Sequence, residues 1–118
     1  MIKLLTPHPI KISSQTAEVT IQMDREYLAR VRPSFDCQYD IEGIPAYDIR
    51  DLDIKGLPTP RDDVTFVASS FVALVAALSG RTDVYAPNTY PGHVTRNIYG
   101  GVDTISSIVS YRGVLKCF

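Results

Sequence analysis

A long apolar segment without internal charge constrains the fold of this chain more than any other feature. It reads TPRDDVTFVASSFVALVAALSGR over residues 59–81, and no charged residue falls between Val64 and Gly80. The opening Thr and Pro suit an N-cap and a first helical position, and the two Asp residues that follow suit the positive end of a helix dipole. Gly80 is typical of a residue that ends a helix. The segment therefore predicts one long buried helix over residues 60–79.

This predicted helix is too short to cross a membrane and is apolar on all sides. Its uncharged interior would rise about 24 Å, whereas the core of a bilayer is ~30 Å thick. Its bulky face consists of Val64, Val67, Phe71, Leu74, Val75 and Leu78, and its small-residue face of Thr65, Ser69, Ala73, Ala76 and Ala77. A helix of this kind needs cover on both faces. The chain's own sheet can cover one face. A second copy of the chain can cover the other, so we predict a homo-oligomer that forms through the small-residue face of helix 60–79.

Short apolar stretches with two-residue alternation predict strands elsewhere in the chain. The motif DIEGIP at residues 40–45 returns as DIKGLP at residues 53–58, which indicates two similar turns around a glycine with positive φ. The first copy predicts a β-hairpin with Glu42 and Gly43 at its tip. The segments EVTIQM, VDTISSIVSY and VLKCF are rich in β-branched or apolar residues and predict further strands.

These elements combine into one fold class. A segment that begins at Asp24 and contains REYLARV predicts a short helix at about residues 24–32. We therefore expect a single α+β domain over residues 1–118. It would have a mostly antiparallel sheet of about five or six strands, with the long helix 60–79 buried on one face. A chain of 118 residues is long enough for one such core.

Charge and cysteine content exclude several classes of function. Twelve Lys and Arg against 13 Asp and Glu leave a net charge of −1, so no overall field attracts nucleic acid or an anionic membrane surface. Cys37 and Cys117 have no spacing typical of a zinc site, and we expect reduced thiols in a cytoplasmic protein. A disulfide between them is the alternative.

The sequence lacks the standard motifs of catalysis and cofactor binding. It contains no GxxxxGK[ST] phosphate loop, no GxGxxG, HExxH or GxSxG, and no helix-turn-helix or zinc-finger pattern. Asp51 and Asp53 would share one face of a strand, but no third ligand for Mg²⁺ accompanies them. We therefore predict no cofactor and no metal, and a binding protein rather than an enzyme.

The candidate binding site is the polar loop APNTYPGHVTRN at residues 86–97. Its two prolines restrict its conformations, so that it would lose little entropy on binding. The loop suits an anionic small molecule or a nucleotide, with rings for stacking, an amide for a base edge and arginines for phosphate. The predicted ligand-binding residues are Arg81, Asn88, Tyr90, His93, Arg96 and Asn97.

Three alternatives stay open from the sequence. Asn, Pro and Gly are also the residues that an ordinary turn requires. The chain is alternatively a protein-interaction, structural or inhibitor subunit, which the small-residue helix face and the exposed hairpin tips favour. The remaining alternative is a small hydrolase or transferase in which His93 acts with Asp83 or Asp103.

Overall fold

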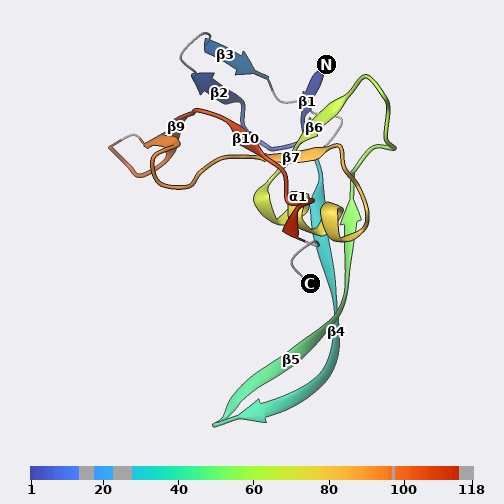
Figure 1. Cartoon of the computed structure of the whole chain (residues 1–118). Helices are drawn as coiled ribbons and strands as arrows, with labels where there is room; N and C mark the ends of the chain where they lie inside the picture. Colours follow the sequence, from blue (N-terminus) through green and yellow to red (C-terminus); the bar gives the residue numbers. More distant parts are fainter. Residues whose placement is uncertain (14–17, 23–27, 97, 115–118) are drawn as a thin grey trace.

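The computed structural model of this chain describes residues 1–13, 18–22, 28–96 and 98–114. Within these ranges it has three small sheets and one helix (Figure 1). Two of the sheets and the helix form the body, and the third sheet is a hairpin that projects away from it.

The first sheet has the strand order β1-β6-β7-β10 and contributes Phe66, Val84 and Ala86 to the core cluster. Its strands are β1 (Ile2–Leu4), β6 (Thr65–Val67), β7 (Val84–Pro87) and β10 (Ile108–Val109). The strands β1, β6 and β7 are parallel, and β10 is antiparallel to β7. Parallel neighbours need a long crossover, which helix α1 (Ser70–Leu78) supplies between β6 and β7.

The second sheet has the order β3-β2-β9-β8. Its strands are β2 (Ile10–Ser13), β3 (Glu18–Ile21), β8 (Val94–Arg96) and β9 (Val102–Ile105). The strand predicted from EVTIQM is thus confirmed over its first four residues. The segment VDTISSIVSY divides between β9 and β10, which belong to different sheets. The predicted strand VLKCF lies, apart from Val114, outside the described residues.

The third sheet is a hairpin of β4 (Arg30–Ile41) and β5 (Ile44–Lys55), and it confirms the predicted turn at Glu42 and Gly43. Gly43 has a φ of +85° and Gly56, in the second copy of the near-repeat, a φ of +84°. Both turns therefore use the positive φ that the sequence indicated.

A β-bulge bends the outer part of this hairpin. Asp36 pairs with Asp48 and Gln38 pairs with Tyr47, so Cys37 is the extra residue, with a φ of +35°. An extra residue increases the local twist of a ribbon. The hairpin accordingly leaves the body as a long, curved ribbon (Figure 1).

The predicted fold class is wrong in its central element, because residues 60–79 are not one long helix. Helix α1 begins at Ser70, and the Ser69 side chain caps it by accepting a hydrogen bond from the Val72 backbone N–H at 3.4 Å. The residues before this cap form a turn and then β6, where β-branched and aromatic side chains fit between β1 and β7. The predicted helix end at Gly80 is confirmed by its φ of +92°. The molecule is mostly sheet, with parallel strands at its centre.

The small-residue face of the helix packs against the chain's own sheet. Ala73 and Ala76 are fully buried in a cluster that includes Phe66 of β6 and Val84 of β7. Small side chains allow the helix to approach the ring of Phe66 closely. The face that was expected to bind a second copy is therefore occupied within the chain. Homo-oligomerisation stays a prediction that needs another surface.

The predicted short helix at residues 24–32 is also corrected where the chain is described. Residues 30–32 belong to β4, and residues 24–27 lie outside the described ranges. The proline at position 33 disfavours helical geometry in the residue before it, which explains the extended conformation. No helix in the described part of the chain has the length and apolar character needed to cross a membrane.

Candidate functional site

The hairpin β4–β5, called the arm below (residues 30–55), exposes apolar side chains on both faces. Because residues that face each other across the ribbon share a side, three large apolar residues lie on each face. They are Tyr39, Ile41 and Ile44 on one face, and Phe35, Tyr47 and Ile49 on the other. These six residues are between 44% and 66% exposed. An isolated two-stranded ribbon is marginally stable in water, so covering these side chains would stabilise the outer half of the arm.

The aromatic side chains of the arm are held in defined positions. The rings of Phe35 and Tyr47 contact each other with centroids 5.9 Å apart and planes tilted by 58°. On the other face, Tyr39 Oη donates a hydrogen bond to Asp48 Oδ1 at 2.9 Å. This hydrogen bond raises the pKa of the Tyr39 phenol above its ordinary value of 10.0, which keeps the donor protonated. Ordered aromatic side chains lose little entropy on binding and are frequent anchors of protein interfaces.

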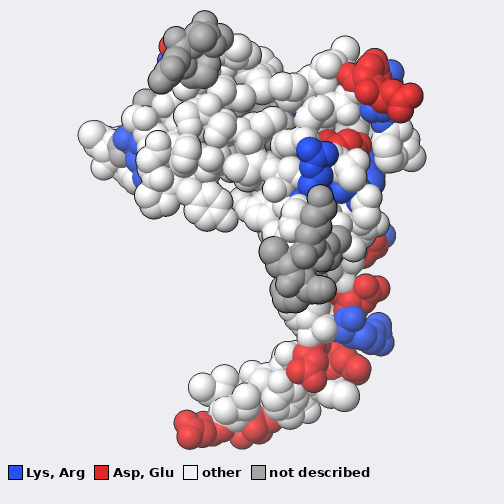
Figure 2. Space-filling view, in the orientation of Figure 1, with Lys and Arg blue, Asp and Glu red and all other residues white. Residues whose placement is uncertain are grey.

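The outer half of the arm, residues 34–49, carries charge of one sign. It contains Asp36, Asp40, Glu42 and Asp48 and no Lys or Arg, which gives it a net charge of −4. Removing these four acids from the chain total leaves 12 bases and nine acids elsewhere, so the remainder has a net charge of +3. Figure 2 shows the tip of the arm in red and white without blue. The arm therefore combines apolar and acidic character.

A shallow groove lies where the arm joins the body. It has a volume of about 540 Å³ and is lined by Ile49, Arg50, Asp51 and Leu52 of β5 and by Phe71, Val75, Leu78 and Ser79 of the α1 segment. Phe71 and Leu78 are half exposed in it. They belong to the bulky face that the sequence predicted to be buried against the sheet. The helix thus directs small residues inward and large apolar residues toward this groove.

The described part of the loop at residues 86–97 contains one predicted site residue that is buried, Asn88, and three that are exposed, Tyr90, His93 and Arg96. Asn88 follows β7, is buried, and donates from Nδ2 to Ser107 Oγ at 3.0 Å, while its Oδ1 accepts from the Tyr90 backbone N–H at 3.3 Å. The Tyr90 side chain is exposed, and hydrogen bonding with Tyr111 raises the pKa of its phenol. His93 is exposed, with Nδ1 lying 3.2 Å from Ser106 Oγ. Asn88 thus acts mainly in holding the loop together.

Of the two predicted arginines, Arg96 lies within this loop and Arg81 lies outside it. Arg96 in β8 donates to the Gly100 carbonyl oxygen at 3.0 Å. Arg81 lies before the amino end of β7, whereas Asn88 follows the carboxyl end of the same strand. The last predicted ligand residue, Asn97, lies outside the described residues. The structure therefore brings Asn88, Tyr90 and His93 into one loop and separates Arg81 from them.

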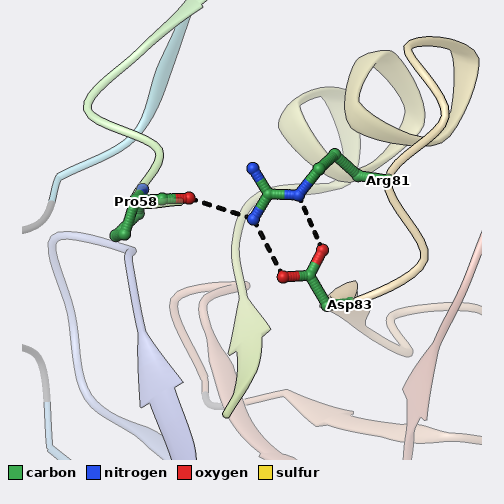
Figure 3. A network of polar contacts seen from close by, with 3 residues as sticks. All are labelled: Pro58, Arg81 and Asp83. Atoms are coloured by element: carbon green, nitrogen blue, oxygen red, sulfur yellow. Dashed lines mark hydrogen bonds and ion pairs between the residues drawn. The ribbon is translucent and has the colours of Figure 1, made fainter. Parts of the chain in front are cut away.

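Arg81 is part of a polar network that joins the segment between α1 and β7 to the loop at Pro58 (Figure 3). Its Nε donates to Asp83 Oδ1 at 2.8 Å, and Nη2 donates to Asp83 Oδ2 at 2.8 Å and to the Pro58 carbonyl oxygen at 3.0 Å. Both charged side chains are less than one-fifth exposed. The Arg81 guanidinium lowers the pKa of the Asp83 carboxyl below its ordinary value of 3.8. This bidentate pair has a structural role that accounts for both residues.

The Asp83→Asn variant tests that role. We expect a loss of about 1–2 kcal/mol in the free energy of unfolding at neutral pH, because one charge-assisted pair is removed. A depressed carboxyl pKa stabilises the fold above the ordinary pKa, and this stabilisation disappears as the pH falls through the folded-state value. Wild type and variant should therefore converge in urea unfolding as the pH is lowered below the ordinary carboxyl pKa of 3.8 and the Asp83 carboxylate is protonated. The control Asp63→Asn removes an exposed pair with Arg61 at 3.9 Å and should change little. A constant difference at all pH values would contradict the assignment.

Sequence reasoning found the hairpin but missed that its outer half is free. The sequence contains one signal of this freedom. Large apolar residues fall on both faces of the hairpin at residues 34–49, and this stretch contains acids without any base. A strand pair packed on a core would bury one face and expose polar residues on the other.

Other kinds of evidence add no second site. Among the described residues, no group of three or more His, Cys, Asp or Glu side chains is placed to hold a metal ion. Comparison of the chain with family models, with curated proteins and with solved structures found no match.

Proposed function

We propose that this chain is a protein-interaction subunit whose arm is the binding element. The observation that carries the proposal is the set of six half-exposed apolar side chains, three on each face of the outer half of the arm. Each strand of the arm pairs only with the other in this part of the chain, so the backbone at both outer edges is also open to pairing. Aromatic rings at the centre of such a surface are typical binding anchors.

The anion-binding loop has less support as the main function. Asn88 is already hydrogen bonded, Arg81 is paired with Asp83, and Arg96 donates to a backbone carbonyl of its own hairpin. Tyr90, His93 and Arg96 are the exposed members, and the one arginine among them already donates to a carbonyl oxygen, which makes a weak anion site. We therefore place the binding function on the arm.

We also propose that the protein acts in the cytoplasm. The support is the thiol of Cys37, which is free and exposed on the arm. Such thiols persist in reducing compartments.

Photo-crosslinking tests the proposed function. We expect p-benzoylphenylalanine at position Tyr39 or Tyr47, in the full chain expressed in its native host, to form a discrete adduct with one protein, a further copy of this chain included. The reason is that a binding arm brings both rings within contact distance of its partner. Adducts are resolved by size and identified by mass spectrometry.

Ile98 is the matched control for these positions. It is 90% exposed on a loop of the body and is apolar, so nonspecific capture should be at least as frequent there as on the arm. We expect the Ile41→Ser/Ile44→Ser variant to reduce the adducts from position 47. Equal yields from positions 39, 47 and 98 would contradict the proposed function.

A further inference from the structure

The arm is electrically polar along its length. Its outer half has a net charge of −4, as described above. Its root, residues 30–33 and 50–55, contains four bases and two acids and has a net charge of +2. The bases are Arg30, Arg32, Arg50 and Lys55, and the acids are Asp51 and Asp53. Figure 2 shows blue atoms near the root and red atoms at the tip.

This polarity distinguishes between two arrangements of a pair of arms. Two arms side by side in the same direction would place −4 next to −4, which is unfavourable. Two arms in opposite directions would place each acidic tip beside the basic root of the other. A two-fold axis perpendicular to the ribbon produces this second arrangement and uses the same surface on both copies. The arm is thus complementary in charge to an inverted copy of itself.

The apolar surfaces fit the same arrangement. Strand β4 spans about 25 Å from Ser34 to Ile41, and this is the length of the outer half of the arm from the root to the tip. In an inverted pair, Ile41 and Ile44 at one tip therefore reach the groove at the root of the other copy. That groove presents the half-exposed side chains of Phe71 and Leu78.

The tips and the grooves both contribute to the buried surface. An inverted arm covers one face of the other, so in this arrangement Tyr39, Ile41 and Ile44 at each tip would contact Phe71 and Leu78 of the partner's groove. A two-fold axis produces this contact twice.

We propose that the partner of the arm is a second copy of this chain, in a two-fold dimer in which each arm lies antiparallel to the other and inserts its tip into the partner's root groove. This inference rests on the proposed function, since it names the partner of the same arm. It moves self-association from the small-residue face of the helix, which is filled internally, to the arm and the groove.

Sedimentation equilibrium of the full-length chain tests the dimer. We expect wild type to dimerise, and the tip variant Ile41→Ser/Ile44→Ser and the groove variant Phe71→Ser/Leu78→Ser each to weaken dimerisation by about 30-fold or more. The Ile98→Ser control should dimerise like wild type. Far-UV circular dichroism and thermal unfolding show that each variant is folded. Wild type that stays monomeric up to about 100 µM would overturn the inference, as would a dimer that neither variant weakens.

Charge reversal provides an independent measurement. We expect Asp40→Lys/Glu42→Lys at the tip to weaken the dimer, and Arg32→Glu/Arg50→Glu at the root to weaken it as well. Adding Asp36→Lys to these four substitutions reverses the polarity, because the outer half then has a net charge of +2 and the root one of −2. This chain should recover dimerisation, since inverted arms are complementary again. If the combined variant is weaker than either pair alone, the antiparallel arrangement is wrong.

The outcomes separate this inference from the function on which it rests. A monomeric wild type whose arm positions still crosslink to a different protein would overturn the dimer and retain the arm as a binding element. A monomeric wild type whose arm positions crosslink no more than position 98 would overturn both.

Discussion

Replacing Phe66 with Ala is expected to lower the free energy of unfolding by about 3–5 kcal/mol. Phe66 is 1% exposed at the centre of the first sheet, and its strand β6 is paired on both sides. Its ring lies in one cluster with Ala73 and Ala76 of helix α1. Alanine side chains are too small to move into the cavity that the substitution would leave. Domains of this size have a total stability of about 5–15 kcal/mol, so the variant should be close to unfolding. Urea unfolding followed by circular dichroism measures the difference.

Phe71→Ala is the matched control, because it removes the same side chain from the same βαβ unit. Phe71 is 51% exposed, so its removal should cost about 1 kcal/mol or less in the monomer. Both variants should be compared at a protein concentration at which wild type is monomeric, since association adds to apparent stability. Similar losses for the two variants would show that the helix buries the opposite face from the one described.

Local turns were predicted better from the sequence than the secondary structure of the apolar segment at residues 60–79. The hairpin tip at Glu42 and Gly43 and the helix end at Gly80 follow from backbone requirements that single residues impose, and both are observed. The helix start was misplaced, because Thr-Pro-Arg-Asp-Asp resembles a helix N-terminus and competes with Ser69, the actual N-cap. The run has no charged residue to mark where the strand ends and the helix begins.

The candidate site was less predictable than the fold. The loop at residues 86–97 was chosen for its polar residues. The hydrogen bond between the Asn88 side chain and Ser107, however, depends on the tertiary pairing of β7 with β10. Arg81 was chosen for its charge, but it forms an ion pair with Asp83 and also donates to the Pro58 carbonyl oxygen. The contact with Pro58 depends on the tertiary fold. The arm was predicted as a hairpin, but its freedom depends on where the body ends. That property is one of three-dimensional packing.

Gly56→Ala is expected to destabilise the fold by about 3 kcal/mol, whereas Gly43→Ala should cost about 1 kcal/mol. The two glycines have φ values of +84° and +85°, so the backbone strain of an added side chain is the same for both. They differ in their surroundings. A Cβ at Gly56 would overlap the carbonyl oxygen of Leu28, while nothing lies within 4 Å of a Cβ at Gly43. Urea midpoints of the two variants give the comparison.

The reason for the larger effect lies in what has to move at Gly56. Leu28 precedes Ala29, which is buried in the core cluster and donates its backbone N–H to the Leu5 carbonyl oxygen at 3.3 Å. Relief of the overlap therefore shifts the first residues of the arm away from β1, at the only end of the ribbon that the core holds. We expect hydrogen exchange of the Ala29 amide to accelerate in Gly56→Ala and to stay at the wild-type rate relative to global unfolding in Gly43→Ala. Equal stability of the two variants, with Ala29 protected in both, would mean that the root of the arm is not anchored through this contact.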